Sequence, residues 1–208
     1  MHIKNIVFDM GGVLVDLNGE RCIDAFEAIG APEVATYVRE CRTEDLFYDI
    51  EIGSTTTEDF CDEVRRMSAC TADNDSIIAA WNALLEPTTS EKRELLLRLK
   101  AAGYHLFLLS NTNDMHWQAA KSHLVPGEGH CIEDYFDGVF LSYELGMQKP
   151  LREIYEALLN QTGINPDETM FVDDNEVNVH AASQVGIHPF HERDGHRWVQ
   201  LLAKLLDE

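Results

Sequence analysis

The sequence predicts an α/β fold with a parallel sheet at its core and an all-helical insertion after the first strand. From Ser90 onward, short apolar runs alternate with helical stretches of about 10–15 residues, which is typical of parallel strands joined by right-handed crossovers. Between the first apolar run and about Leu85, apolar residues recur only at helical spacing. We therefore expect a Rossmann-like core domain of residues 1–16 and 87–208 and a helical cap subdomain of residues 17–86.

The first strand is the apolar run Ile6–Phe8, which we interpret as a buried parallel strand. It ends abruptly at Asp9, and Gly11 and Gly12 then allow a tight turn and a close approach of the backbone to a ligand. A carboxylate at the carboxyl end of a buried strand lies where open α/β sheets bind their ligands. The alternative is a strand that ends in an aspartate before an ordinary turn.

The predicted cap consists of four or five short helices. Gly30 and Gly53 end two of them, and Thr56 followed by Asp59 resembles a capping box at the start of another. The expected helices are Arg21–Ile29, one that begins near Pro32, Thr43–Ile52, one that follows Thr56, and Asp75–Leu85.

The rest of the core is predicted from strands that alternate with amphipathic helices. The expected strands are His105–Leu109, Gly138–Ser142, Thr169–Val172 and Ile187–Phe190. The expected helices are Ser90–Ala102, Met115–Leu124, Arg152–Gln161, Val177–Val185 and Trp198–Leu206. Such an order implies a parallel sheet that is covered on both faces.

Composition excludes several classes of function. The formal net charge is 16 − 37 = −21 with no cluster of Lys or Arg, so we expect no nucleic-acid partner. No apolar run approaches the ~20 residues of a membrane span, so we expect no membrane partner either. The five cysteines are scattered without a CxxC pair, which favours reduced thiols in a cytoplasmic protein. We expect a monomer or a weak homodimer.

Chemically active side chains follow the carboxyl ends of successive predicted strands. They are Asp9, Ser110, Lys149 in the loop beyond the third strand, and the pair Asp173 and Asp174. All these ends meet at one edge of a parallel sheet, where the carboxylates would repel each other without a cation between them. Carboxylate oxygens without Cys or His favour Mg²⁺. With Lys149 and Ser110 as partners for phosphate oxygens, Asp9 becomes a candidate nucleophile for phosphoryl transfer.

The chain resembles the haloacid dehalogenase (HAD) superfamily, because it contains counterparts of the four sequence signatures of that superfamily in the same order. They are the run from Phe8 to Leu14, Leu109-Ser110-Asn111, Lys149-Pro150, and Val172-Asp173-Asp174 with Asn178 following. The resemblance covers essentially the whole chain, including a helical cap between the first and second signatures. It is strongest to bacterial glucose-1-phosphate phosphatase-like members and to the N-terminal phosphatase domain of epoxide hydrolases.

The resemblance implies a Mg²⁺-dependent phosphatase that hydrolyses a small phosphorylated metabolite, a sugar phosphate in our reading, through an aspartyl-phosphate intermediate. Asp9 would be the nucleophile, and Ser110, Asn111 and Lys149 would contact the phosphate. The implied metal ligands are Asp9, Asp174, the backbone carbonyl of Gly11, and Asp173 either as a ligand or as a residue that supports one. Asn178 would support the metal site.

One position departs from the family pattern. Phosphatases of the family usually carry a second aspartate, the general acid and base, two positions after the nucleophile, where this chain has Gly11. The proton would then come from Asp16, from a cap residue or from water. In the cap, Tyr48 and Glu51 belong to a segment that often faces the site in this family. We expect Tyr48 to contact substrate, although a place in the cap core fits it equally, and Glu51 is also compatible with solvated surface.

Two other functions remain open from the sequence. A metal-independent 2-haloacid dehalogenase also lacks an aspartate at the Gly11 position, but it has no use for the paired acids Asp173 and Asp174. A non-catalytic phosphosugar-binding protein is the third possibility, and Gly11 is its only support.

Overall fold

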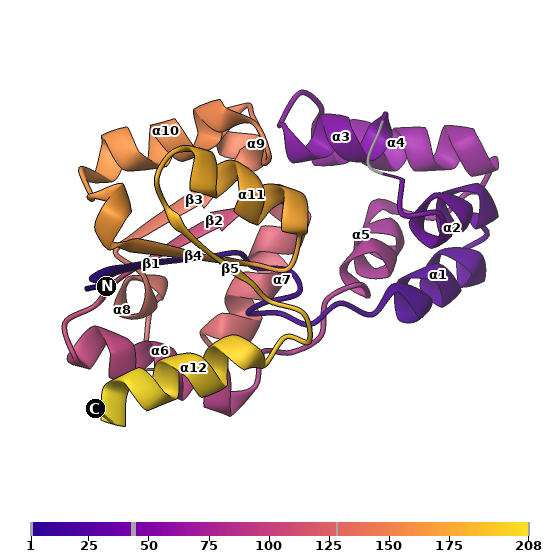
Figure 1. The fold of residues 1–208 in the computed structure, drawn as a ribbon. Coiled ribbons are helices and arrows are strands. Elements are labelled where there is room, and N and C mark those ends of the chain that lie inside the picture. Colours follow the sequence, from indigo (N-terminus) through magenta and orange to yellow (C-terminus); the bar gives the residue numbers. More distant parts are fainter. Residues whose placement is uncertain (1, 43–44, 128, 208) are drawn as a thin grey trace.

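A five-stranded parallel sheet forms the centre of the molecule in the computed structural model, which describes residues 2–42, 45–127 and 129–207 (Figure 1). The strand order is β3-β2-β1-β4-β5, and every neighbouring pair is parallel. The strands are β1 (Asn5–Phe8), β2 (His105–Ser110), β3 (Gly138–Leu141), β4 (Thr169–Asp173) and β5 (His188–His191). The predicted α/β class is confirmed.

Helices cover both faces of this sheet, as its apolar strands require. Ile6 and Phe8 of β1 point to one face, where Trp198 meets Phe8 edge-on at 5.0 Å, and Val7 points to the other. The first face is covered by α6 (Ser90–Ala101), α7 (Asp114–Leu124), α8 (Ile132–Tyr135) and α12 (Arg197–Asp207). The second is covered by α9 (Ser142–Leu145), α10 (Arg152–Thr162) and α11 (Glu176–Gln184), with a 3-10 turn at Pro166–Glu168 before β4.

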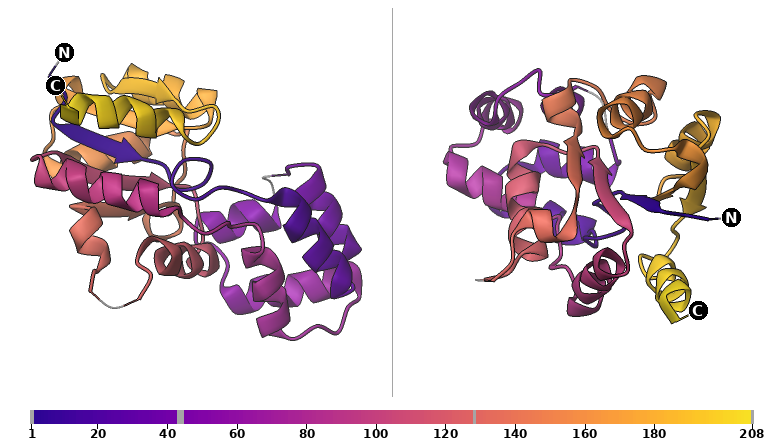
Figure 2. Two further views of the ribbon diagram at one scale, coloured as in Figure 1. Left: turned by 90° about the horizontal axis from the view of Figure 1, so that it is seen from below. Right: turned by 90° about the vertical axis from the view of Figure 1, so that its left-hand side faces the viewer.

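The segment between β1 and β2 folds into a separate helical cap, which Figure 2 shows to one side of the sheet. The cap has its own apolar core, in which Phe47 stacks on Trp81 at 4.7 Å. The capping box predicted at Thr56 and Asp59 is confirmed. The cap helices are α1 (Gly19–Ala28), α2 (Pro32–Arg39), α3 (Leu46–Glu51), α4 (Thr57–Ser68) and α5 (Asn74–Asn82). The expected start of one helix at Thr43 lies outside the described residues.

The chain enters and leaves the cap side by side. Asn18 N donates to the carbonyl of Leu84 at 2.7 Å, and Glu86 N donates to the carbonyl of Asp16 at 2.8 Å. A second link comes from α7, where the buried His116 ring stacks on Trp81 at 4.5 Å. The cap is therefore tied to the end of the core where the strands point, which is the end that carries the candidate site.

The structure differs from the predicted elements at the end of β3. The sequence predicts a strand through Ser142, whereas β3 ends at Leu141 and Ser142 begins the short helix α9. The reason is a local bond network: Thr112 N donates to Ser142 Oγ at 2.9 Å, and that hydroxyl donates back to the Thr112 carbonyl at 3.0 Å. These bonds turn the chain toward the loop after β2. The short helix α8 was also not predicted.

The cysteines and the lengths of the helices bear on two of the expectations drawn from composition. Each of the five cysteines is free. Within the described residues no helix has both the length and the apolar composition that crossing a membrane requires.

Candidate active site

Asp9 is the first residue after β1, and the turn that follows holds its carboxylate in place. Met10 N donates to Asp9 Oδ1 at 2.7 Å, and only 8% of the residue is exposed. Gly12 has a φ of +69°, and a Cβ there would lie 2.3 Å from Asp174 Oδ2. Glycine is thus required at this position both by the backbone conformation and by the close approach of the Asp174 carboxylate. The turn between Asp9 and Val13 therefore packs directly against Asp174, just beyond the end of β4.

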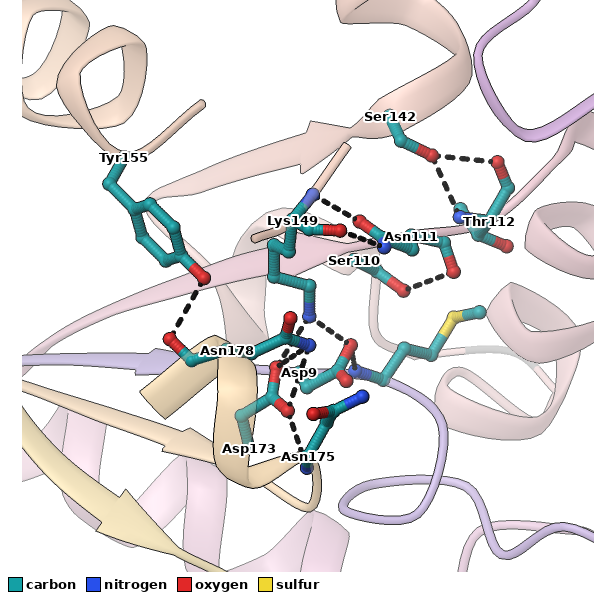
Figure 3. A network of polar contacts seen from close by, with 11 residues as sticks. Asp9, Ser110, Asn111, Thr112, Ser142, Lys149, Tyr155, Asp173, Asn175 and Asn178 are labelled. Carbon is teal, nitrogen blue, oxygen red and sulfur yellow. Dashed lines mark hydrogen bonds and ion pairs between the residues drawn. The ribbon is translucent and has the colours of Figure 1, made fainter. Parts of the chain in front are cut away.

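Lys149 is the buried cation of the site (Figure 3). Its ammonium lies 2.9 Å from Asp9 Oδ1 and 2.7 Å from Asp173 Oδ2, and the residue is only 2% exposed. The loop that carries it is fixed by Asn111, whose side chain accepts from Lys149 N and donates to the Lys149 carbonyl, both at 2.8 Å. The loop after β2 thereby sets the position of a side chain from the loop beyond β3.

Asp173 ends β4 and orients Lys149. Its Oδ1 accepts from Asn175 N at 2.8 Å, and Asn178 Nδ2 lies 3.1 and 3.2 Å from its two oxygens. The hydroxyl of Tyr155 donates to the Asn178 carbonyl at 2.9 Å and so steadies the start of α11. Both oxygens of the fully buried Asp173 are therefore engaged by these donors and by Lys149.

Asp174, the next residue, is exposed and keeps its carboxylate on the site side of the Gly12 turn. Ligand oxygens of Asp9, Asp173 and Asp174 all lie within 4.8 Å of one another. Burial is the main cause that raises the pKa of both Asp9 and Asp174; the charge of Asp173 raises them further, while Lys149 opposes the rise. Three carboxylates thus face one ammonium, an arrangement that a dication would balance.

These residues fit a hard cation. The donor set offers only oxygen atoms, as Mg²⁺ prefers. Asp174 is the exposed carboxylate of the three, and the missing Cβ of Gly12 leaves the space that Asp174 occupies. The engaged oxygens of Asp173 make it a support for Lys149 more than a ligand.

The other predicted contact residues differ in their burial and in their hydrogen-bond partners. Ser110 ends β2, is 1% exposed and donates to the Asn111 carbonyl at 3.4 Å. Asn111 uses both ends of its side chain on the Lys149 backbone, so a contact with phosphate would have to come from its main chain. Tyr48 lies on α3 with 38% of its surface exposed, and within the described residues it makes no hydrogen bond to Asp9 or Lys149.

Asp16 is directed to another partner. Its Oδ1 lies 2.8 Å from Nζ of Lys92, which is fully buried in α6. A Cβ on Gly195, before α12, would lie 3.0 Å from the same oxygen. Asp16 therefore anchors the start of the cap connection to the helices on the first face of the sheet.

Tyr155 lies near the site without having been predicted there, whereas Glu51 belongs to the cap segment that was expected to face the site. Tyr155 is fully buried in α10, and its sequence pattern marks only an apolar helix face. Glu51 is half-buried at the end of α3; burial raises its pKa to about 7, and the Lys149 ammonium opposes this rise. The signal for Glu51 was its place beside Tyr48 in the cap segment just before Gly53.

Comparison with known proteins agrees with this arrangement. A model of the haloacid dehalogenase-like hydrolases matches residues 3–186. The chain belongs to this family. It is therefore a hydrolase, and the predicted family and fold are confirmed.

Similar proteins include two from Bacteroides thetaiotaomicron. The chain is 32% identical over 205 residues to its D-ribitol-5-phosphate phosphatase, with 99% of each sequence covered. It is 38% identical to a HAD family enzyme solved with magnesium and inorganic phosphate, with a TM-score of 0.89 and coverage of 96% of this chain and 98% of that one. An (S)-2-haloacid dehalogenase of Burkholderia cepacia is 29% identical, but the match covers 55% of this chain and 46% of that protein.

Proposed function

We propose that this hydrolase is a Mg²⁺-dependent phosphatase that hydrolyses a small phosphomonoester, a sugar or polyol phosphate, through an aspartyl-phosphate at Asp9. The observation that carries the proposal is the buried ammonium of Lys149, held between Asp9 and Asp173 beside the exposed Asp174. The similarity to a D-ribitol-5-phosphate phosphatase over nearly the full chain supports the substrate class.

Each residue of the site has its own role in the two steps of this reaction. An Asp9 oxygen attacks phosphorus as the ester bond to the leaving oxygen breaks, and water then attacks the aspartyl-phosphate and releases inorganic phosphate. Lys149 offsets negative charge on the phosphoryl group, and Asp173 keeps its ammonium aimed at Asp9. We assign Ser110 and the backbone amide of Asn111 as donors to the phosphoryl oxygens.

Asp9, Asp174 and the carbonyl of Gly11 would hold the Mg²⁺ ion. Such an ion polarises phosphoryl oxygens and lets two anionic groups, the nucleophile and the phosphate, approach each other. The positive charge of the ion would also neutralise part of the negative charge of the carboxylates at this edge of the sheet.

A metal-independent 2-haloacid dehalogenase is the weaker candidate. Its reaction has no need for a cation between Asp9, Asp173 and Asp174, which lie close enough to share one. The dehalogenase relative also matches only about half of the chain, whereas the phosphatase relative matches nearly all of it.

A panel of phosphate esters tests the proposal. Purified protein should release inorganic phosphate in the presence of Mg²⁺, and EDTA or the substitution Asp9→Asn should abolish that release. A 2-haloacid tested without metal should release no halide. Phosphate release that is unaffected by EDTA and by Asp9→Asn would contradict the proposal.

We also propose that the enzyme works in the cytoplasm as a monomer or a weak homodimer. The free cysteines suit a reducing compartment, and a net charge of −21 opposes self-association. Light scattering after gel filtration and cell fractionation measure both points. A stable higher oligomer, or protein recovered outside the cytoplasm, would contradict them.

A further inference from the structure

We infer that Glu51, presented by the cap helix α3, is the acid–base group that gives a proton to the leaving oxygen and takes one from the attacking water. This inference rests on the proposed phosphatase function and supplies the group that its site lacks. It follows from what occupies position 11, from where the acids near the site are directed, and from how α3 meets the core.

An apolar side chain, Leu17, lies beside Gly11. A Cβ on Gly11 would be in van der Waals contact with Cδ1 of Leu17 at 3.4 Å, so an apolar side chain borders position 11. The turn after Asp9 therefore offers an isobutyl group in place of a proton donor. The acid must come from another part of the molecule.

The acids of the core are committed to other partners. Asp173 is saturated by Lys149 and two asparagine groups, and Asp174 faces the carboxylate cluster. Asp16 pairs with the buried Lys92 on the first face of the sheet. None of these carboxyls is placed to act as a proton donor to the leaving group.

The end of α3 is fixed against the core beside the Lys149 loop. A Cβ on Gly53 would lie 2.1 Å from the carbonyl oxygen of Tyr143, so the chain just after Glu51 packs directly on α9. The loop that follows α9 carries Lys149. Figure 1 shows α3 at the edge of the cap that meets α9. Glycine at position 53, with a φ of +69°, permits this contact, which sets the end of α3 beside the segment that leads to Lys149.

Glu51 is half-buried there, and Lys149 is the charged side chain that acts on it. Among the described residues it has no hydrogen bond or ion pair of its own that would hold it charged, and burial raises its pKa to about 7. The helices packed against α3 are α4 and α9, together with α2 and α5, whose Tyr37 and Trp81 meet Phe47. None of the titratable side chains of these four helices is a cause of this shift: Glu33, Tyr37, Arg39, Glu58, Asp59, Cys61, Asp62, Glu63, Arg65, Arg66, Asp75, Tyr143 and Glu144. A carboxyl near neutral pKa suits both halves of the reaction.

Glu51 gives up a proton in the first step and recovers one in the second. As the bond between phosphorus and the ester oxygen breaks, its electron pair goes to that oxygen, which takes the proton of the Glu51 carboxyl and leaves as an alcohol. The Glu51 carboxylate then accepts a proton from the water that attacks phosphorus. The bond from phosphorus to Asp9 breaks, which restores the Asp9 carboxylate, the protonated Glu51 and free phosphate.

The test compares two leaving groups in the variant Glu51→Gln. A sugar or polyol phosphate needs a proton on its leaving oxygen, whereas p-nitrophenyl phosphate leaves as a stable phenolate. We expect kcat for the alkyl ester to fall by about 10²–10⁴-fold with KM little changed, while kcat for the formation of p-nitrophenolate falls much less. The loss of alkyl-ester activity in the wild type as pH rises past about 7 should also disappear in the variant.

The matched control is Glu58→Gln, the same change at an exposed position of α4. It should leave both activities unchanged. An equal loss on both substrates in Glu51→Gln, or no loss on either, would overturn the role of Glu51 and leave the phosphatase function standing. Failure of the wild type to release phosphate from any ester would instead overturn the proposed function, and this inference with it.

Discussion

Removal of the ammonium of Lys149 should weaken the fold as well as the activity. In Lys149→Met the carboxylates of Asp9 and Asp173 would stay buried without the cation that lies 2.9 and 2.7 Å from them. Breaking a buried ion pair by removing one partner costs about 3–5 kcal/mol. For a chain of this size, 1 kcal/mol shifts the melting temperature by about 2–4 °C, so the metal-free variant should melt about 6–20 °C below the wild type.

Differential scanning fluorimetry in EDTA and then in Mg²⁺ measures this effect. Mg²⁺ should reduce the loss, because a dication between Asp9 and Asp174 replaces part of the missing positive charge. Adding Asp173→Asn to Lys149→Met should recover part of the stability and none of the phosphatase activity. Lys204→Met, at an exposed position of α12, is the control and should change neither. An unchanged melting temperature for Lys149→Met in EDTA would refute the electrostatic reasoning.

Three further predictions concern neighbouring groups. Gly12→Ala would place a Cβ 2.3 Å from Asp174 Oδ2, so calorimetric titration should show Mg²⁺ affinity reduced about 10–100-fold, and unchanged affinity would contradict the assigned ligand. Asn178→Ala removes a donor to the buried Asp173 and should lower the free energy of unfolding by about 1–3 kcal/mol in urea titrations; no change would mean that the bond adds nothing. The pKa of Glu51 rises from 4.5 to about 7 on folding, so the folded state binds more protons in this window. Stability should therefore fall as pH rises from 4.5 to 7, and Glu51→Gln should flatten that slope, whereas an unaltered slope would contradict a buried carboxyl.

Much of the core fold could be predicted from local patterns. Strands such as Ile6–Phe8 are buried on both faces and therefore form continuous apolar runs, and the chemically active residues follow their ends. The structure brings Asp9, Lys149, Asp173 and Asp174 together in this way. The boundary between core and cap, set at residues 17 and 86, stays a prediction. Near these residues, hydrogen bonds join the two connections through which the chain enters and leaves the cap.

Contacts that depend on tertiary packing could not be predicted. Ser142 looks like the end of a strand, and only its bonds to the distant Thr112 turn it into the start of a helix. Tyr155 looks like any apolar helix residue until its hydroxyl reaches the Asn178 carbonyl. For Glu51 the sequence leaves solvated surface as an alternative to a place facing the site, because nothing in its neighbours' sequence reveals that the cap packs on α9. Long-range packing decides which side of a helix faces another domain, and the local sequence pattern does not indicate that side.

The most direct test of the central claim is to look for phosphate on Asp9 itself. Wild-type protein mixed with Mg²⁺ and a substrate from the ester panel is quenched in acid within milliseconds and mapped by mass spectrometry. We expect the peptide that contains Asp9 to gain the mass of one phosphoryl group, and to lose it when EDTA is added before the substrate. A turning-over enzyme in which that peptide stays unmodified, with the phosphoryl group on another residue or on none, would contradict the account.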